Sequence, residues 1–363
     1  MSRSTFGTRF TITTWGESHG EALGVVVDGC PAGLPISTED VQVFLDRRKP
    51  GKSRYVTARN ESDQVRILSG VFEGKTTGTP ISMLVENQDH RSADYSRIKD
   101  VYRPGHADYT FDQKYGFRDY RGGGRSSGRE TLSRVAGGAV ACRFLSELGI
   151  RFTTYASSIG PVRAASFDPE EIARNPFCLP DASAAEKASA YLEECMAQHD
   201  STGGVIECRI EGVPAGIGDP VFGKLDALFA QALMSIGAVK AVEIGDGTAV
   251  SEAKGSSNND AFAMKDGTVT KLTNHAGGIL GGISDGSTIL LRAHVKPTPS
   301  ISLPQQTVSN TGEPCTLTIE GRHDPVIVPR AVVVVETMAA LVLADSLLLN
   351  MTSRLDRIRE FYR

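Results

Sequence analysis

The segment 326–349 is the most apolar stretch of this chain and constrains the fold more than any other part of it. A helix that is apolar on all sides has to be enclosed, either by the rest of the protein or by lipid. Arg330, Glu336 and Asp345 interrupt the run, whereas a membrane span carries almost no charge over its ~20 residues. We therefore predict a buried core helix with Pro329 near its first turn.

The composition is that of an ordinary globular chain. Its 363 residues are 40% hydrophobic and 23% charged, with a formal net charge of −4. A general nucleic-acid binder should be basic, so we expect no nucleic-acid partner. No apolar run precedes Phe6, so we expect neither a signal peptide nor a membrane anchor. The six cysteines form no CxxC pair, which argues against a metal site and favours a reduced, cytoplasmic protein.

Hydrophobic periodicity predicts a mixture of strands and helices. Strands are predicted at residues 8–15, 24–28, 65–72, 81–86, 150–157, 205–210, 239–244 and 289–295. Helices are predicted at residues 38–48, 132–148, 182–198 and 221–236, and Ser37 or Thr38 is placed to cap the first. The polar segment 87–113 is interpreted as a long functional loop, and the polar segment 251–266 as a mobile one.

Two parts of the chain repeat one local pattern. Residues 24–33 and 205–216 are each a predicted strand that runs into Gly-x-Pro-Ala-Gly. Such an echo indicates either two structurally related halves or a chance match of a common strand–turn pattern. We expect residues 1–363 to form a single domain, with two related halves as a hypothesis.

Residues 121–131 pack three arginines, four glycines and two adjacent serines into one short segment. Glycine lets backbone N–H groups approach a ligand, arginine binds anions through paired hydrogen bonds, and hydroxyls add neutral ones. The helix predicted at 132–148 follows, and a helix N-terminus favours negative charge. The segment therefore predicts either a site for phosphate and other anionic oxygens or an exposed loop that contacts nucleic acid.

Further candidate residues carry positive charge or could transfer protons. A basic cluster after the first predicted helix is either a solvated face or part of an anion site; it contains Arg47, Arg48, Lys49, Lys52 and Arg54. His19 and His106 lie in glycine-flanked loops, where imidazole can serve proton transfer or structure. Arg322 could hold Asp324 ionised and ready to accept a proton, although an Asp before Pro also suits a plain turn.

Two other motif classes are disfavoured. Residues 16–20 fit the G-x-S-x-G pattern of a hydrolase nucleophile elbow, but a strand rather than a helix is expected after them. Residues 46–53 and 69–76 are near matches to a phosphate-binding loop that lack its first glycine and a following helix. Neither a serine hydrolase nor a nucleoside-triphosphate site is favoured.

Six motifs, taken together, resemble the chorismate synthase family. They are Gly16-Glu17-Ser18-His19-Gly20, Arg103-Pro104-Gly105-His106-Ala107-Asp108-Tyr109, residues 121–131, residues 274–282, Lys296-Pro297-Thr298, and Gly321-Arg322-His323-Asp324-Pro325. They occur in the family's order and cover nearly the whole chain; residues 161–202, 251–267 and the C-terminal tail match weakly. Each motif alone is modestly specific, whereas six in order are very specific.

The resemblance implies an α+β fold, a β-α-β sandwich with central helices between antiparallel sheets, and a homotetramer. It implies a lyase that converts 5-enolpyruvylshikimate 3-phosphate to chorismate and phosphate by 1,4-anti-elimination. This is the last common step of aromatic amino acid biosynthesis in the shikimate pathway. The family needs reduced FMN although the reaction has no net redox change, and NADPH is a candidate external reductant.

The resemblance also implies roles for individual residues. His19 would protonate or stabilise the departing phosphate, His106 would donate a proton toward the reduced flavin, and Asp324 would help take a proton through flavin N5. The implied flavin contacts are Arg125, Ser126, Ser127, Gly237, Ala238, Gly281, Lys296, Pro297, Thr298, Pro299, Ser300 and Arg322. The implied substrate contacts are Ser18, Arg48, Arg54, Arg129 and Arg134. Arg48 and Arg54 could instead bind NADP, and the expected partners are a small phosphorylated substrate and an external flavin reductant.

The chain departs from the family pattern at three positions. Gly128 stands where Ala is usual, Gly237 where Asn is usual, and Pro299 where Ser is common. These changes bear on flavin affinity rather than on the proton-transfer groups. The first alternative is an NADPH-dependent flavin reductase or other flavoenzyme, against which no G-x-G-x-x-G opens a helix after a strand.

Overall fold

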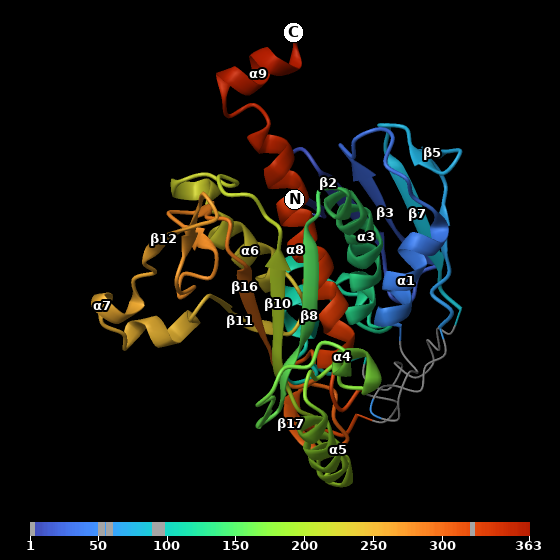
Figure 1. The fold of residues 1–363 in the computed structure, drawn as a ribbon. Coiled ribbons are helices and arrows are strands. Elements are labelled where there is room, and N and C mark those ends of the chain that lie inside the picture. The colour runs from blue at the N-terminus through green and yellow to red at the C-terminus, as the bar shows by residue number, and fades with distance from the viewer. Residues whose placement is uncertain (1–3, 50–54, 56–60, 89–98, 320–323) are drawn as a thin grey trace.

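The computed structural model describes residues 4–49, 55, 61–88, 99–319 and 324–363. It is a sandwich in which helices lie between two five-stranded antiparallel sheets (Figure 1). The first sheet has the order β1 (Thr5–Phe6), β2 (Thr11–Gly16), β3 (Ala22–Asp28), β7 (Ile81–Glu86), β4 (Val65–Ile67). The second has the order β11 (Val239–Ile244), β16 (Ile289–Val295), β10 (Gly204–Glu211), β8 (Arg151–Ile159), β9 (Val162–Arg163). The expected α+β sandwich is confirmed.

Two long helices form the middle of the sandwich. Helix α8 (Val328–Asn350) packs on the second sheet, and helix α3 (Thr131–Glu147) packs on both α8 and the first sheet. Helices α1 (Thr38–Arg48) and α6 (Leu225–Met234) flank them. Gly138 permits the close approach of α3 to α8, because a Cβ there would lie 2.4 Å from Cβ of Thr337.

Helix α8 confirms the predicted core helix. Its length and hydropathy would suit a membrane span, but 78% of its most apolar window is buried inside the protein. Its acidic residues have internal partners. Glu336 binds both Nη atoms of Arg47 at 2.7 Å, and Asp345 accepts hydrogen bonds from the backbone N–H groups of residues 8–10. The charges that interrupt the apolar run therefore hold α1 and the N-terminal strand region against α8.

Helix α1 has the predicted bounds, and a capping box explains its start. Oγ of Ser37 accepts a hydrogen bond from the backbone N–H of Asp40, whose carboxylate accepts one from the backbone N–H of Ser37. Arg47 and Arg48 lie in its last turn, where positive charge is favoured by the helix dipole.

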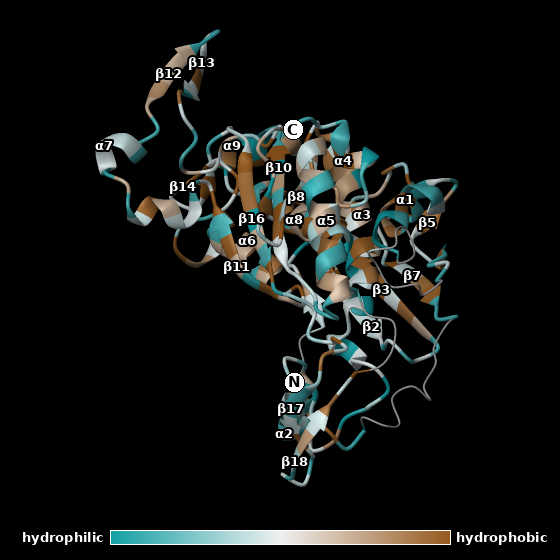
Figure 2. Cartoon of the chain, turned by 90° about the horizontal axis from the view of Figure 1, so that it is seen from below, coloured by the Kyte–Doolittle hydropathy of each residue, from teal (hydrophilic) through white to brown (hydrophobic). Residues whose placement is uncertain are grey.

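The remaining elements are short or peripheral. They are β5 (Val71–Phe72), β6 (Lys75–Thr76), β12 (Phe262–Lys265), β13 (Thr268–Lys271), β14 (Ile279–Leu280), β15 (Ile283–Ser284), β17 (Gln305–Val308), β18 (Pro314–Leu317), α2 (Asp108–Tyr115), α4 (Glu171–Arg174), α5 (Ala182–Ala197), α7 (Gly255–Asn258) and α9 (Leu355–Phe361). Helix α2 and the β17–β18 hairpin lie together at one end of the molecule, and the β12–β13 hairpin projects at another (Figure 2).

Four predicted segments differ from the structure. The predicted strand 65–72 is divided into β4 and β5, and the predicted helix 221–236 begins with a separate 3-10 turn at Val221–Gly223. The prediction of a loop throughout 87–113 is wrong at its end, because α2 begins at Asp108. The segment 251–266 contains α7 and a strand of a hairpin. These elements are polar, so hydrophobic periodicity gave no signal for them.

The two Gly-x-Pro-Ala-Gly turns are held by the same hydrogen bonds. Oγ1 of Thr76 donates to the carbonyl of Pro31 at 2.6 Å. It also accepts, at 2.9 Å, from the backbone N–H of residue 34, three residues after that proline. Oγ of Ser284 does the same at Pro214, with the same two distances. The strands before the turns, β3 and β10, are each the central strand of their sheet. These correspondences support the hypothesis of two related halves, which stays a hypothesis.

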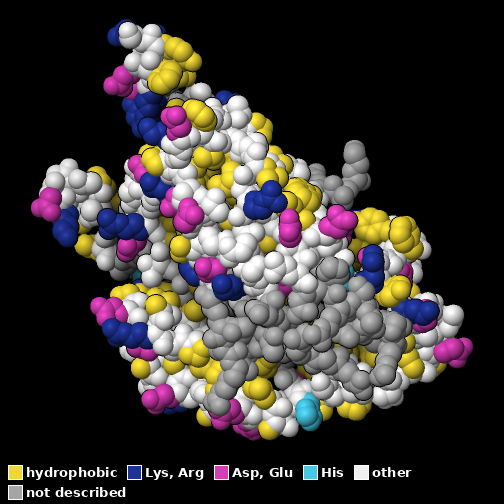
Figure 3. Space-filling view, turned by 90° about the vertical axis from the view of Figure 1, so that its right-hand side faces the viewer, with side chains coloured by type: hydrophobic (Ala, Val, Ile, Leu, Met, Phe, Trp, Pro, Cys, Tyr) yellow, Lys and Arg dark blue, Asp and Glu magenta, His cyan; other side chains and the backbone are white. Residues whose placement is uncertain are grey.

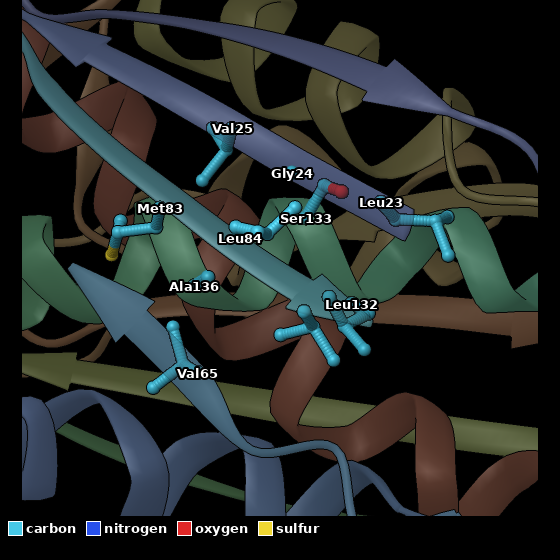
Figure 4. Close-up of a pocket in the computed structure, with 10 residues that line it drawn as sticks. Leu23, Gly24, Val25, Val65, Met83, Leu84, Leu132, Ser133 and Ala136 are labelled. Atoms are coloured by element: carbon cyan, nitrogen blue, oxygen red, sulfur yellow. The ribbon is translucent and has the colours of Figure 1, made fainter. Parts of the chain in front are cut away.

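Helix α3 meets the first sheet across a narrow apolar gap (Figure 4). The gap is lined by Leu23, Gly24, Val25, Val65, Met83, Leu84, Val85, Leu132, Ser133 and Ala136, and it has no room for a water molecule. The hydroxyl of Ser133 is fully buried there and has no hydrogen-bond partner among the described residues. An unpaired buried hydroxyl destabilises the folded state, so this position is a packing weakness.

Candidate active site

The arginine- and glycine-rich segment folds as two 3-10 turns that lead into α3. The turns span Gly124–Ser126 and Gly128–Glu130. Oγ of Ser126 donates to a carbonyl within the segment at 2.7 Å, and Oγ of Ser127 accepts from the N–H two residues further on at 3.2 Å. The predicted arrangement, a glycine-rich loop before a helix, is confirmed, and both serine hydroxyls contribute to its shape.

His19 lies in the turn between β2 and β3, and the same segment packs over it. A Cβ at Gly122 would lie 2.6 Å from Cδ2 of His19 and 3.0 Å from Oγ of Ser18, so only glycine fits there. The hydroxyl of Ser18 is buried and has no hydrogen-bond partner within the described chain. Because this turn joins two antiparallel strands, it is not the strand-to-helix turn of a nucleophile elbow.

His106 stands beside a buried ion pair. Nε and Nη2 of Arg103 donate to the two carboxylate oxygens of Asp108 at 2.7 and 2.6 Å, and Nδ1 of His106 lies 3.3 Å from Oδ1 of Asp108. Burial alone would raise the pKa of Asp108, but the hydrogen bonds from Arg103 and His106 hold it well below its ordinary value. Asp108 is therefore an anion at neutral pH. Nη2 of Arg103 also donates to the carbonyl of Gly122 at 3.0 Å.

Arg48 and Arg129 are buried and share one carboxylate. Nη2 of Arg48 lies 2.6 Å from Oδ2 of Asp63, and Nη1 of Arg129 lies 3.0 Å from Oδ1. Burial raises the pKa of Asp63, but the two guanidinium groups lower it by more than burial raises it. The pKa of Asp63 therefore lies below its ordinary value. Nε of Arg129 donates to Oδ1 of Asn87, whose amide donates to the carbonyl of Gly20 in the His19 turn at 2.8 Å.

Asp324 accepts a hydrogen bond from an arginine that sequence reasoning did not single out. Nη1 of Arg330, in the first turn of α8, donates to Oδ2 of Asp324 at 2.7 Å. Nε of Arg330 donates to the carbonyl of Arg48 at 3.2 Å. The expected partner Arg322 lies outside the described residues, as does Arg54. The pairing of Arg322 with Asp324 therefore stays a prediction, and the start of α8 brings Arg330 to the carboxylate as well.

The Lys-Pro-Thr-Pro-Ser run at 296–300 contacts the His106 loop directly and is linked to the Asp324 segment through residues 201 and 202. Nζ of Lys296 donates to the carbonyl of Gly105 at 2.8 Å, and Oγ of Ser201 donates to the carbonyl of Thr298 at 2.7 Å. The N–H of the next residue, 202, donates to the carbonyl of Pro325 at 2.9 Å. Pro299 packs against the same glycine as Lys296. The Thr298 hydroxyl is buried without a partner in the described structure.

These contacts form one closed series around the site. The series runs through Asp324, Arg330, Arg48, Asp63, Arg129, Asn87, the His19 turn, Gly122, Arg103, Asp108, His106, Lys296, Thr298 and residues 201–202, and returns to Pro325. The series thereby links His19, His106 and Asp324, the three residues expected to handle protons, which are far apart in sequence.

Arg125 and Arg134 share a second buried carboxylate, that of Glu130. Nε of Arg134 donates to Oε2 of Glu130 at 2.8 Å, and Nη2 of Arg125 lies 3.6 Å from Oε1. Arg125 also donates to Oγ1 of Thr14 at 2.6 Å, and Arg134 to Oγ of Ser235 at 2.6 Å. Each expected site arginine that the structure describes thus has a protein partner, so an anionic ligand would have to compete with these contacts.

Two of the three remaining expected residues border the same run. The carbonyl of Ala238 accepts a hydrogen bond from the backbone N–H of Lys296 at 2.9 Å. A Cβ on Gly237 would meet nothing within 4 Å, so there is room for the Asn that we take as usual for the family. Gly281 lies in the turn between β14 and β15, and no hydrogen bond or ion pair among the described residues joins it to the series.

Sequence reasoning missed the buried carboxylates of the site. Asp63 lies 15 residues from Arg48 and 66 from Arg129 in the chain, so no local spacing pointed to it. Glu130 and Arg134 are four residues apart, the spacing of neighbours on a helix, and this pair was detectable.

A hollow borders the site at the His19 turn, where Gly20 and Asn87 line it. It has a volume of about 860 Å³, and three carboxylates, those of Glu17, Glu21 and Glu86, line it beside Trp15. Negative lining does not suit a phosphorylated ligand. Cationic and anionic side chains are interspersed on the described part of the face in Figure 3.

Comparison with known proteins decides the family. The family model for chorismate synthase matches residues 10–348. The chain belongs to the chorismate synthase family. It is 61% identical to the chorismate synthase of Agathobacter rectalis and 62% identical to that of Lachnospira eligens, in both cases over 100% of both chains. The chorismate synthase of Chloroflexus aurantiacus is 54% identical over 98% of both chains.

A solved structure agrees with the family assignment. A crystal structure of chorismate synthase matches with a TM-score of 0.78 and 31% identity, over 98% of this chain and 97% of that one. The resemblance noted from the six motifs is thus confirmed, and the chain is a lyase-family enzyme of aromatic amino acid biosynthesis. The match also covers segments that the motifs left weakly matched.

Proposed function

We propose that this enzyme converts 5-enolpyruvylshikimate 3-phosphate to chorismate and phosphate by 1,4-anti-elimination. One observation carries the proposal: His19, His106 and Asp324 belong to one closed series of contacts that also includes buried arginines. A trianionic substrate needs cations to bind it, and the elimination needs groups that manage a proton and a departing phosphate. The site contains both kinds of group.

His19 and Ser18 are assigned to the phosphate that leaves. Both side chains are at least nine-tenths buried, and the Ser18 hydroxyl is available to donate a hydrogen bond. In this assignment the imidazole stabilises or protonates the phosphate oxygen as the C–O bond breaks. A buried site strengthens that electrostatic contribution.

His106 and Asp324 are assigned to proton handling at the other end of the reaction. Asp108 holds Nδ1 of His106, which leaves Nε2 for a ligand. Nη1 of Arg330 donates a hydrogen bond to Oδ2 of Asp324 and holds this carboxylate in place. The proton that leaves C6 would thus have a carboxylate within the same site.

The residues present fit an FMN cofactor. Gly124 has positive φ and open space beside its backbone, and the Thr298 hydroxyl is buried with no partner among the described residues. The residues that would hold the flavin are Arg125, Ser126, Ser127, Gly237, Ala238, Lys296, Pro297, Thr298, Pro299 and Ser300, with Arg322 and Gly281 assigned by resemblance alone. When bound in its reduced form, FMN would supply electron density during phosphate loss.

The arginines Arg48, Arg129 and Arg134 are assigned to the substrate's phosphate and carboxylates. In the structure they are paired with Asp63 and Glu130, so the substrate would share or displace these partners. Arg48 and Arg54 could serve NADP instead, and we propose that NADPH acts only through an external flavin reductant. A homotetramer in the cytoplasm is the proposed state of the enzyme.

Anaerobic phosphate release from 5-enolpyruvylshikimate 3-phosphate tests the proposal. Three reactions are compared, with chemically reduced FMN, oxidised FMN and no flavin. Phosphate release together with chorismate absorbance only in the first supports the lyase and its cofactor. NADPH oxidation without substrate, and no phosphate release in any reaction, would instead favour the flavin reductase alternative.

A further inference from the structure

Arg103 lies in the His106 loop and reaches the backbone of Gly122, the glycine that packs on His19. Its guanidinium donates to both oxygens of Asp108, which holds His106, and to the carbonyl of Gly122, which packs on His19. Its own backbone N–H also donates to Asp108 at 3.0 Å. The side chain is 6% exposed, so these bonds form away from water.

The contact with Gly122 fixes the position of His19. Gly122 has φ +82, and its backbone lies so close to the imidazole that a Cβ would be 2.6 Å from Cδ2 and 2.9 Å from Nε2. Any shift of this glycine therefore moves the ring or opens space beside it. The bond from Arg103 to the glycine carbonyl restrains such a shift.

The contact with Asp108 fixes His106. Three charged groups besides Arg103 surround this histidine: Asp108 at 3.3 Å, Arg118, whose Nε lies 4.0 Å from the same carboxylate, and Lys296, which binds the carbonyl of the preceding residue. Asp108 is the anion among them and orients Nδ1. Arg103 in turn holds both oxygens of Asp108 in place.

We propose that Arg103 is a positioning residue that couples His19 and His106, so that both proton-transfer groups keep their places together. The proposal rests on the function proposed above. Lysine cannot replace it, because an ammonium group cannot bind two carboxylate oxygens and a carbonyl with the planar geometry of guanidinium.

The test is Arg103→Lys, compared with Arg292→Lys as a matched control. Like Arg103, Arg292 binds a carboxylate and a backbone carbonyl, those of Glu207 and Gly245, and no hydrogen bond or ion pair among the described residues joins it to the series of contacts around the site. Arg103→Lys is expected to lower kcat on the order of 10–100-fold with a smaller change in KM, as loss of a positioning partner does. Arg292→Lys is expected to stay within about twofold of wild type.

A cycle of variants separates coupling from general damage. In the His19→Ala or the His106→Ala background, Arg103→Lys should cost much less than it does in wild type, because part of its role is already lost. An unchanged cost in both backgrounds would overturn the proposal. Asp108→Asn is the second variant: adding Arg103→Lys to it should cost little more than Asp108→Asn alone, because the carboxylate that Arg103 holds is already lost. Full additivity of the two changes would contradict the arrangement.

A readout without turnover keeps this test apart from the function itself. Imidazole NMR signals of the ligand-free protein are recorded for wild type, Arg103→Lys and Arg292→Lys. Arg103→Lys should move the signals of both His19 and His106, and Arg292→Lys should move neither. Movement of only one histidine in Arg103→Lys would overturn the coupling. Absence of phosphate release by the wild-type enzyme would count against the proposed reaction alone.

Discussion

Arg330 donates a 2.7 Å hydrogen bond to Asp324 and thereby ties the proposed proton acceptor to the first turn of the central helix α8. The same guanidinium contacts the carbonyl of Arg48 at 3.2 Å. The longest helix of the core therefore positions a carboxylate of the site. Arg330 belongs both to this core helix and to the surroundings of the proposed proton acceptor.

Asp324→Asn should keep substrate binding and slow the elimination, because the amide has nearly the shape of the carboxylate but cannot accept the proton. We expect kcat to fall by roughly 100-fold or more with little change in substrate Kd. Steady-state kinetics and anaerobic equilibrium binding measure the two quantities. Loss of binding with normal turnover at saturation would assign Asp324 to positioning instead.

Gly122→Ala should reduce turnover because the new Cβ has to displace the His19 ring. We expect kcat to fall at least ~10-fold, in keeping with the cost of small misplacements in active sites. Gly116→Ala is the matched control, since Gly116 has φ +80 but nothing within 4 Å of its Cβ position. It isolates the backbone strain. Equal activity of the two variants would mean that contact with His19 is unimportant.

Asp63→Asn should destabilise the protein in a pH-dependent way. Removing the charge leaves Arg48 and Arg129 buried with less compensation, which costs roughly 3–5 kcal/mol at neutral pH. The folded-state pKa of Asp63 lies below its ordinary 3.8, so its contribution is present above about pH 4 and is lost as the pH falls through the folded pKa. Urea unfolding at several pH values measures this. If the difference in the free energy of unfolding between wild type and Asp63→Asn grew as the pH falls, it would contradict this prediction.

Gly237→Asn should tighten FMN binding. The space beside Gly237 is open, and an amide there could hydrogen-bond a ligand next to Lys296. We expect the Kd for FMN, measured by fluorescence quenching, to fall by a few-fold, on the order of one neutral hydrogen bond. Gly255→Asn, at an equally open position in α7, serves as the control and should leave the Kd unchanged. Weaker binding in Gly237→Asn would place the flavin elsewhere.

Ser133→Ala should stabilise the protein without affecting turnover. The substitution removes a buried hydroxyl that has no partner in the described chain and places a better helix former in α3. We expect a gain of about 1 kcal/mol in the free energy of unfolding. A loss of stability would show that the hydroxyl makes a favourable contact in solution.

The sequence predicted local structure best where one strong local signal was present. The capping box at Ser37 set the start of α1, and the apolar run correctly indicated a buried α8. Polar elements such as α2 were not predicted, because their stability comes from tertiary contacts rather than from a periodic apolar face. The sandwich itself followed from the family resemblance, since periodicity gave only mixed helix and strand.

In the candidate site, too, residues with a strong local signal were predicted and residues without one were not. Motifs indicated His19, His106 and Asp324, whose glycine- and proline-rich surroundings are distinctive in sequence. The groups that hold them were harder to find, because Asp63 and Arg330 reach their partners through the fold. Long-range ion pairs leave no spacing pattern in one sequence, so their discovery required the structure.

The most direct test of the account is a single-turnover reaction of the enzyme with reduced FMN and 5-enolpyruvylshikimate 3-phosphate under strict anaerobiosis. Phosphate, chorismate absorbance and the flavin spectrum are followed together. The account predicts equal amounts of phosphate and chorismate, with the flavin reduced again at the end. Net oxidation of the flavin in proportion to product, or phosphate release that is independent of flavin, would contradict it.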